Sequence, residues 1–135
     1  MKYQKIRNYK YKLADSVMIE TGIKSDGYSH YFFTLDKEGL LVIHKGYLWD
    51  GVSGPTVDTK NTMLSGLVHD ALYQAIRLGR LHPDFKPQVD NLFYTMLLDA
   101  GVNKIRAYYY YKAVKTFGHL SCRVGDIKIP KSLFA

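Results

Sequence analysis

The chain has 135 residues, of which 47% are hydrophobic and 14% aromatic, so it suits one domain with a core and is not typical of a disordered protein. Cys122 is the single cysteine, which excludes an intramolecular disulfide. The formal net charge of +7 suits a basic surface, and it also suits an anionic partner such as a phospholipid surface or nucleic acid. Recognition of a specific nucleic-acid sequence is not expected, because no zinc-finger, RNP or recognition-helix motif is present.

The N-terminal segment does not have the pattern of a targeting signal. The lysines and arginines of residues 1–12 are not followed by the apolar run of a signal peptide. No stretch of the sequence reaches the length of a transmembrane helix. We therefore expect a soluble protein that is made inside a cell.

Residues 1–46 are predicted to be rich in β-structure. Tyrosines and basic residues in 1–13 favour an arm or an edge strand. Further strands are predicted where β-branched and aromatic residues gather, at 16–21, 30–35 and 40–44. The turn Asp36-Lys37-Glu38-Gly39 joins the last two into an antiparallel hairpin. His30 and His44 are then strand residues, interpreted as surface or cross-strand residues rather than ligands.

The segment 47–60, rich in Gly, Asp, Ser and Thr, is predicted to be a loop. Glycines let backbone carbonyls turn inward, and carbonyls together with a carboxylate are the ligands of a hard cation such as calcium. Asp50, Gly51 and Ser53 are therefore candidate calcium ligands. Ser53 as a nucleophile would lack the Gly-x-Ser-x-Gly elbow, and its hydroxyl better fits a loop or cap role.

Three helices are predicted in residues 61–118 from the spacing of apolar residues. They span about 61–78, 87–100 and 103–116, with Gly79, Gly101 and Gly118 after their ends and Asn103 as an N-cap. The short link between the first two predicts an antiparallel pair. The tail, 119–135, holds a strand-like piece at 126–129. We expect an α+β fold in a single domain, 1–135, with an antiparallel β-hairpin or small sheet before the three-helix unit.

The run Leu67-Val68-His69-Asp70-Ala71-Leu72-Tyr73 carries titratable side chains that an apolar helix face does not need. His69 and Tyr73 are four residues apart and share a face, and Asp90 on the antiparallel partner helix can come level with His69. An aspartate that is hydrogen-bonded to an imidazole fixes the tautomer of the ring and leaves its other nitrogen to act as a general base. Tyr73 would hold Asp90 through its hydroxyl, while Asp70 would face the glycine-rich loop and complete a cation site.

Two other interpretations stay open for these side chains and for the tyrosines further along. A buried histidine–aspartate pair can be a satisfied polar contact that joins two helices, with no catalytic role. The run Tyr108-Tyr109-Tyr110-Tyr111 surrounds a helix, so that some rings pack and others are exposed. A stacking platform for bases is the alternative reading of that run.

The pattern His69-Asp70-x-x-Tyr73, with Asp90 on the next helix, resembles the phospholipase A2 superfamily, and its spacing is similar to that of the short prokaryotic branch. The segment Gly51-x-x-Gly54-Pro55-x-x-Asp58 loosely resembles the calcium loop of that superfamily, although its glycines are spaced differently. The resemblance implies a catalytic set in which His69 is the general base, Asp90 orients it and Tyr73 supports Asp90. It also implies that Asp70 is a side-chain ligand of calcium.

From Tyr47 to Gly118 the sequence is also similar to an uncharacterised family of small proteins encoded by tailed phages and prophages. The shared motifs are an Asp-Gly-x-Ser-x-Pro loop, the His-Asp-x-x-Tyr motif, an Asp that opens the next helix and a closing Phe-Gly. In this chain they fall at Asp50–Pro55, His69–Tyr73, Asp90 and Phe117-Gly118. The resemblance implies a phage origin, with a location in the host cytoplasm or the virion, and supplies no reaction.

These observations predict a bacteriophage-type protein with a phospholipase-A2-like His/Asp site, acting as a metal-assisted ester hydrolase. Calcium is the expected cofactor, and an anionic phospholipid surface or a host or virion protein is the expected partner. The alternative is a non-enzymatic virion or assembly protein, or an inhibitor of a host component, in which the His/Asp pair is structural.

Overall fold

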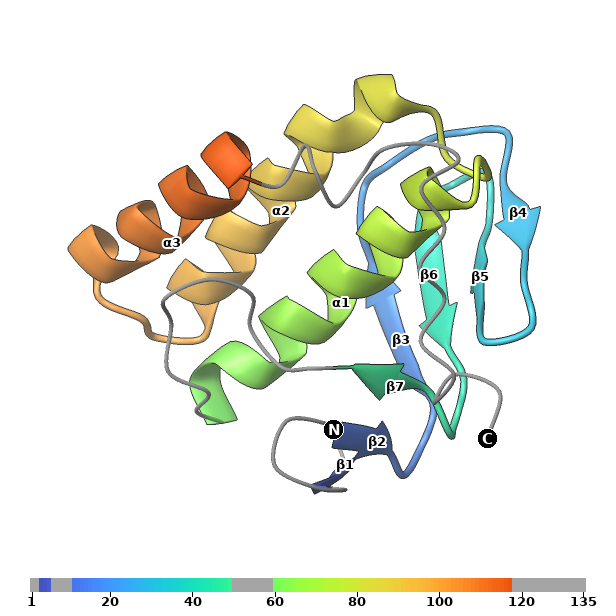
Figure 1. Ribbon diagram of the computed structural model, residues 1–135, viewed down its shortest axis with the longest axis horizontal. Helices are drawn as coiled ribbons and strands as arrows, with labels where there is room; N and C mark the ends of the chain where they lie inside the picture. Colours follow the sequence, from blue (N-terminus) through green and yellow to red (C-terminus); the bar gives the residue numbers. More distant parts are fainter. Residues whose placement is uncertain (1–2, 6–10, 50–59, 118–135) are drawn as a thin grey trace. The chain divides into compact units, whose positions relative to one another are not determined.

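The computed structural model describes residues 3–5, 11–49 and 60–117. The described residues fall into two compact units, a unit of β-strands that ends at Trp49 and a unit of helices that begins at Lys60. Strands therefore precede three α-helices along the chain (Figure 1). This confirms the α+β fold class, while the single domain over 1–135 stays a prediction.

The first sheet of the strand unit has three antiparallel strands in the order β1-β2-β7. They are β1 (Tyr3–Lys5), β2 (Tyr11–Leu13) and β7 (Leu48–Trp49). The rings of Tyr3, Tyr11 and Trp49 contact one another across these strands, with centroids 5.6 to 6.0 Å apart. The predicted arm thus contributes two strands. The prediction of a loop from residue 47 is wrong at its start, because Leu48 and Trp49 pair with β2.

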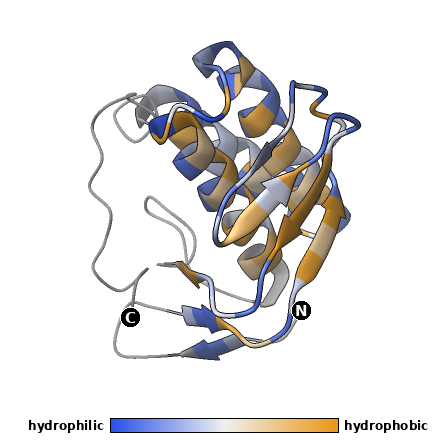
Figure 2. Cartoon of the chain, turned by 90° about the vertical axis from the view of Figure 1, so that its right-hand side faces the viewer, coloured by the Kyte–Doolittle hydropathy of each residue, from blue (hydrophilic) through white to orange (hydrophobic). Residues whose placement is uncertain are grey.

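The second sheet has four antiparallel strands in the order β3-β6-β5-β4. They are β3 (Val17–Glu20), β4 (Tyr28–Ser29), β5 (Phe33–Leu35) and β6 (Leu40–Ile43). The register places Phe33 opposite Ile43 and Leu35 opposite Leu41, and all four side chains are at most 1% exposed. Alternate residues of a strand share a face, so this pairing produces the hydrophobic stripe that Figure 2 shows along the sheet.

The predicted hairpin between residues 30 and 44 is confirmed, but its first strand begins later than predicted. The backbone N–H of His30 donates to the carbonyl of Phe33 (2.9 Å), and the N–H of Phe32 donates to Nδ1 of His30 (3.4 Å). These bonds make a turn at 30–32, and β5 begins only at Phe33. His30 is therefore a turn residue whose ring stacks on Phe33, with centroids 5.0 Å apart.

The turn between β5 and β6 depends on Asp36 and Gly39. The Asp36 carboxylate accepts hydrogen bonds from the backbone N–H groups of Glu38 and Leu40, both at 2.9 Å. Gly39 has φ 98°, and a Cβ atom there would lie 2.9 Å from the backbone nitrogen of Ile23. Only glycine fits this conformation and this contact without a shift of the backbone.

The helical unit contains α1 (Lys60–Arg77), the short 3-10 helix η1 (Pro83–Phe85), α2 (Lys86–Asp99) and α3 (Lys104–Phe117). Each α-helix begins and ends within one residue of its predicted bounds. Past the end of α1, Gly79 takes the left-handed conformation (φ 72°) that closes helices. The Asn103 side chain accepts a hydrogen bond from the N–H of Ile105 at 2.8 Å and so caps α3.

Helices α1 and α2 form the antiparallel pair, and α3 packs on α2. Phe93 and Leu97 of α2 form a core cluster with residues one helical turn apart on α3, which are Ala107, Tyr110 and Val114. None of the helices that the structure describes is long and apolar enough to cross a membrane. The strand-like piece predicted at 126–129 lies outside the described residues.

Candidate functional site

The site begins with two side chains on one face of α1. His69 and Tyr73 are four residues apart and are 3% and 4% exposed, as expected for residues on the same buried stripe of a helix. Their ring centroids lie 3.9 Å apart. The ring of Phe93 on α2 lies 4.8 Å from the imidazole. These rings hold the imidazole in one orientation and keep water from its sides.

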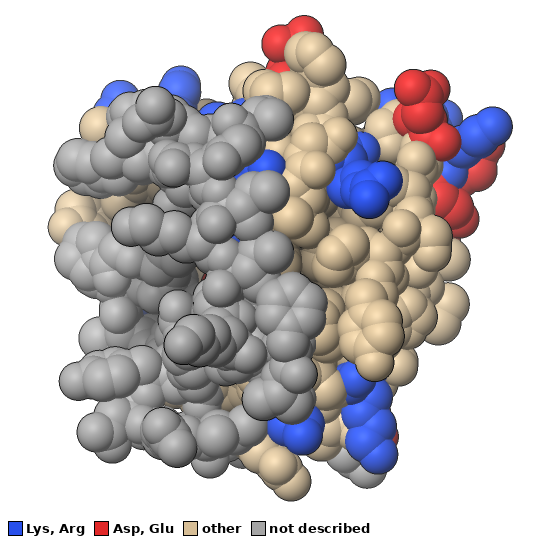
Figure 3. Space-filling model, turned by 45° about the vertical axis from the view of Figure 1, so that its right-hand side comes forward, with Lys and Arg blue, Asp and Glu red and all other residues tan. Residues whose placement is uncertain are grey.

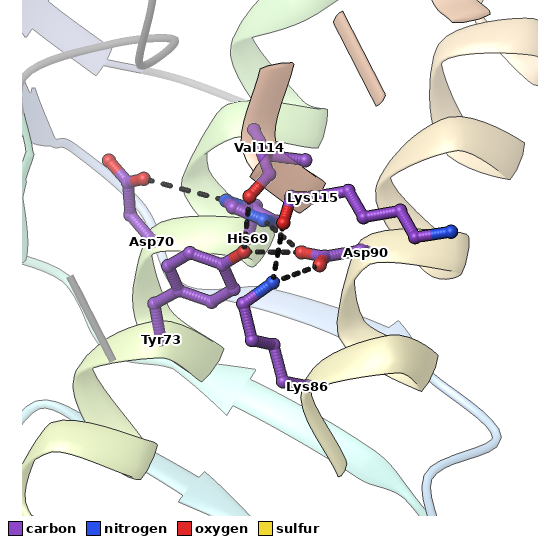
Figure 4. Close-up of polar contacts among 7 residues, drawn as sticks. All are labelled: His69, Asp70, Tyr73, Lys86, Asp90, Val114 and Lys115. Atoms are coloured by element: carbon purple, nitrogen blue, oxygen red, sulfur yellow. Dashed lines mark hydrogen bonds and ion pairs between the residues drawn. The ribbon is translucent and has the colours of Figure 1, made fainter. Parts of the chain in front are cut away.

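Helix α2 brings Asp90 level with His69. Nε2 of His69 lies 3.0 Å from Oδ1 of Asp90, and the two side chains are 3% and 2% exposed (Figure 4). The hydroxyl of Tyr73 donates a hydrogen bond to the same oxygen. The structure therefore brings together the three residues of the predicted catalytic set, whose catalytic roles stay predictions.

Lys86 is a fourth member of the network, which the sequence reasoning missed. Its ammonium group donates to Oδ2 of Asp90 at 2.7 Å and to the backbone carbonyl of Lys115 at 3.5 Å. It also lies 5.8 Å from the centre of the Tyr73 ring. Lys86 precedes Asp90 by four residues, which is a spacing that predicts an ion pair on a helix. The predicted second helix begins at residue 87, whereas α2 begins at Lys86.

The network reaches the third helix through backbone carbonyls. The Tyr73 hydroxyl lies 3.4 Å from the carbonyl oxygen of Val114, and Lys86 donates to the next carbonyl, that of Lys115. Both carbonyls belong to the last turn of α3, where carbonyls lack partners within the helix. Figure 4 shows Asp90 at the centre of these contacts.

The charges of the buried pair follow from burial and from the donors around it. Burial would raise the pKa of Asp90, but hydrogen bonds from His69, Lys86 and Tyr73 outweigh it and lower that pKa. Burial lowers the pKa of His69 although Asp90 acts in the opposite direction. At neutral pH the carboxyl group is therefore ionised and the imidazole is neutral. Nε2 then carries the proton that is donated to Asp90, and Nδ1 is the acceptor of the ring.

Nδ1 of His69 faces the side of α1 that carries Asp70 (Figure 4). The distance from Nδ1 to Oδ1 of Asp70 is 4.0 Å, which is too long for a direct hydrogen bond. The Asp70 side chain is 22% exposed, whereas that of His69 is 3% exposed. Asp70 and Asp90 thus lie beside different nitrogens of the imidazole, Nδ1 and Nε2 respectively.

The predicted calcium ligands cannot be assembled from the residues that the structure describes. Asp50, Gly51 and Ser53 lie outside them, and so does the rest of the 50–58 segment. Within 3–5, 11–49 and 60–117, no group of three or more His, Cys, Asp or Glu side chains could hold a metal ion. Asp70 supplies one carboxylate, while calcium takes six or more oxygen ligands. Calcium binding stays a prediction.

A hollow of about 450 Å³ lies on the Asp90 side of the network. It is lined by Lys86, Pro87, Asp90, Asn91, Tyr111 and Lys115. The hollow thus reaches the buried carboxylate between α2 and α3, and His69 is not among its lining residues.

Comparison with known proteins gives one family. The sequence pattern of a family described as "Protein of unknown function (DUF1353)" matches residues 27–114. This span includes all four residues of the buried network, His69, Tyr73, Lys86 and Asp90. No curated protein and no solved structure matches the chain. The expectation of an uncharacterised family is confirmed, whereas the phage origin and the phospholipase A2 resemblance stay predictions.

Proposed function

Because the chain belongs to the DUF1353 family, whose description assigns no activity, we propose a function from the site itself: hydrolysis of an ester, with His69 as the general base. Asp90 is the residue that positions and supports the imidazole, and Tyr73 and Lys86 position Asp90. The observation that carries this proposal is the 3.0 Å contact between Nε2 of His69 and Asp90, which leaves Nδ1 as an acceptor.

The reaction follows from that tautomer. Nδ1 would take a proton from a water molecule while the water oxygen attacks the ester carbonyl. The imidazolium that forms is stabilised by the ionised carboxylate of Asp90. The same proton then passes from Nδ1 to the leaving alcohol oxygen as the carbon–oxygen bond breaks. General acid–base catalysis of this kind contributes about 10²–10⁴-fold to a rate.

Lys86 fits this role through its ion pair with Asp90. A buried carboxyl group tends to take up a proton, because burial disfavours the charged form. The ammonium group 2.7 Å from Oδ2 keeps Asp90 ionised and ready to accept from Nε2. The cost is that the positive charge of Lys86 also lowers the pKa of His69.

The resemblance to phospholipase A2 supports the ester as the bond that is cleaved, and it proposes calcium as the cofactor. Asp70 on the Nδ1 side of the ring would be a ligand, with the 50–58 segment supplying others. A calcium ion there would polarise the ester carbonyl. The described residues do not complete such a site, so the steps above use His69 and Asp90 alone. The phage-type motifs likewise support an origin in a phage or prophage.

The test is hydrolysis of a chromogenic short-chain ester and of phosphatidylglycerol vesicles, with calcium or with a chelator. We expect His69→Gln to reduce the rate by about 10²–10⁴-fold. His82→Gln is the matched control, because His82 is also close to an aspartate but is 67% exposed. Urea unfolding of each variant separates lost chemistry from lost stability. An inactive wild-type protein, or equal losses in both variants, would refute the proposal.

A non-enzymatic role is the second candidate, and the burial of the network favours it. His69 is only 3% exposed, and the carboxylate of Asp90 has three donors, as a purely structural pair would. In that case the protein would act in a virion, in assembly or on a host component. Loss of stability in His69→Gln, with no ester hydrolysis by the wild type, is the result that this role predicts. Mass spectrometry of purified phage particles would then test for a virion component.

A further inference from the structure

The outer surface of the helical unit exposes apolar side chains that its core does not use. Six large hydrophobic side chains are exposed in the part of the chain that the structure describes, and four belong to α2 and α3. These are Leu98 (36% exposed), Ile105 (81%), Tyr108 (52%) and Tyr109 (53%). Single exposed apolar residues are ordinary, but one of these four, Tyr108, belongs to a cluster of tyrosine rings between α2 and α3.

The tyrosines continue along the line where α2 and α3 meet. The ring of Tyr94 on α2 lies 6.4 Å from that of Tyr108 and 5.4 Å from that of Tyr111, and the latter two are 6.1 Å apart. Tyr111 also lines the hollow beside Lys86 and Lys115. The three tyrosine rings are therefore next to the hollow that Lys86 and Lys115 line. We define the tyrosine–lysine seam as Lys86, Tyr94, Tyr108, Tyr111, Lys112 and Lys115.

Rings and positive charges alternate along this seam. Tyr108 and Lys112 are four residues apart, as are Tyr111 and Lys115, so each of these two rings has a lysine one turn further on. Nζ of Lys115 lies 5.7 Å from the centre of the Tyr111 ring.

The charge of the seam is positive overall. Helix α3 contains four basic residues and no acidic one. The nearest acidic groups on α2 are Asp90, which is paired with Lys86, and Asp99 at the end of the helix. On the face drawn in Figure 3, by contrast, some basic side chains lie among uncharged residues and others, at the upper right, lie beside acidic ones.

A ligand that suits the seam must carry flat apolar groups and anionic groups in alternation. A nucleotide strand has this chemistry, because bases stack on aromatic rings while lysines meet the phosphates. A lipid surface fits less well, because tyrosines outnumber aliphatic residues here, whereas helices that lie on membranes present Leu, Phe or Trp. We infer that the tyrosine–lysine seam binds single-stranded nucleic acid without sequence preference.

In this arrangement the bases lie against Tyr108 and Tyr111, and the phosphates lie near Lys112 and Lys115. Lys86 and the ionised carboxylate of Asp90 pair at the inner end of the hollow, so the net positive charge of the seam comes from Lys112 and Lys115. The seam shares Lys86 with the His69 network, but it does not include Nδ1 of His69, which faces the side of α1 that carries Asp70.

The experiment measures fluorescence anisotropy of a labelled oligothymidylate of about 15 nucleotides with the full chain, at several salt concentrations. We expect Tyr108→Ala to weaken binding about tenfold, which is within the range for loss of one stacked base. Lys115→Gln should reduce the slope of log K against log salt by about 0.7, the value for one phosphate contact on a single strand.

Two variants of the strand unit are the matched controls. Tyr31→Ala removes a tyrosine that is 83% exposed, and Lys24→Gln removes an exposed lysine; neither should change the affinity or the salt slope. If the control variants lose as much affinity as the seam variants, the binding is a diffuse charge attraction and the inference is overturned. The inference is also overturned if the wild-type protein does not bind the oligonucleotide. Binding to phosphatidylglycerol vesicles that the two seam variants weaken while oligonucleotide binding is unchanged would overturn it as well.

Discussion

Among the described residues of the helical unit, one histidine–aspartate pair lies inside the unit, between α1 and α2, and another lies on its surface connector. His69 and Asp90 are 3% and 2% exposed, and their 3.0 Å contact joins α1 to α2. His82 and Asp84 are 67% and 90% exposed, with 3.4 Å between Nδ1 and Oδ2. The exposed imidazole also accepts a hydrogen bond from the backbone N–H of Asp84 at 3.1 Å. His82 and Asp84 thus stabilise a single turn at η1, whereas His69 and Asp90 join helix α1 to helix α2.

The difference between the pairs shows that environment, rather than residue type, decides what such a pair does. Around the exposed pair, water and salt screen the charges, so the ion pair contributes little. Around the buried pair, each group that loses its partner keeps a desolvated charge or dipole, which is costly. The variants below test this contrast, in order of decreasing expected effect.

Asp90→Asn should be the most destabilising of these changes. It removes the charge that pairs with Lys86 and accepts from His69 and Tyr73. Breaking a buried pair by removing one partner costs about 3–5 kcal/mol, which urea unfolding followed by circular dichroism would measure. Asp84→Asn at the exposed pair is the control. Similar losses in the two variants would contradict the contrast.

Tyr73→Phe should have an intermediate effect. The change removes the hydroxyl that donates to Asp90 and approaches the Val114 carbonyl, and it keeps the buried ring. Oδ1 of Asp90 still accepts from His69, so the loss is that of one hydrogen bond to a charged group, about 1.5–3 kcal/mol. Because Tyr94 is only partly buried, Tyr94→Phe serves as the control in the same unfolding measurement. An unchanged stability in Tyr73→Phe would mean that its hydroxyl does not support Asp90.

Acid should destabilise the protein through the buried pair. Burial lowers the pKa of His69 from its ordinary value of 6.5. Burial alone would raise the pKa of Asp90, but the hydrogen bonds from His69, Lys86 and Tyr73 outweigh it and lower that pKa from 3.8. The unfolded chain therefore binds more protons than the folded one, first below about pH 6.5 through His69 and then below about pH 3.8 through Asp90. The free energy of unfolding should fall by at most about 1.4 kcal/mol per pH unit for each group. His69→Gln should abolish the first part of this loss, and a pH dependence that is unchanged in this variant would contradict the assignment.

His82→Ala should have the smallest effect. It removes the acceptor for the N–H of Asp84, which solvent replaces at this exposed position. We expect a change in the free energy of unfolding of less than about 0.5 kcal/mol. A loss comparable to that of Asp90→Asn would show that the connector, and not only the network, fixes the helices.

The helices could be predicted closely because their signals are local. Gly79 follows the end of α1, Asn103 caps α3, and the apolar spacing between such signals gives the helical period. The meeting of His69 and Asp90 followed from the short connector, which requires antiparallel helices. Lys86 was missed because η1 occupies the connector and α2 begins one residue before the predicted start, at Lys86 itself.

The strands could be predicted less well because their pairing is not local. Leu48 and Trp49 were predicted to be loop residues because the segment that follows them is rich in Gly, Asp, Ser and Thr. They form a strand because β2, far earlier in the chain, pairs with them. His30 has a strand-like neighbourhood, but its ring nitrogen accepts the N–H of Phe32 and favours a turn instead. Competition of this kind between side chain and backbone cannot be read from β-propensity.

The donors around Asp90 have a consequence for how the helical unit comes apart. Tyr73 of α1 contacts the carbonyl of Val114, and Lys86 of α2 contacts the carbonyl of Lys115, both on α3. The carboxyl group of Asp90 holds both of these side chains in place. Loss of that group should therefore release the end of α3 as well as the contact between α1 and α2, which faster hydrogen exchange of the amides in all three helices would reveal. Any change at position 90 in the course of evolution would have to be compatible with the assembly of three helices as well as with chemistry at the imidazole.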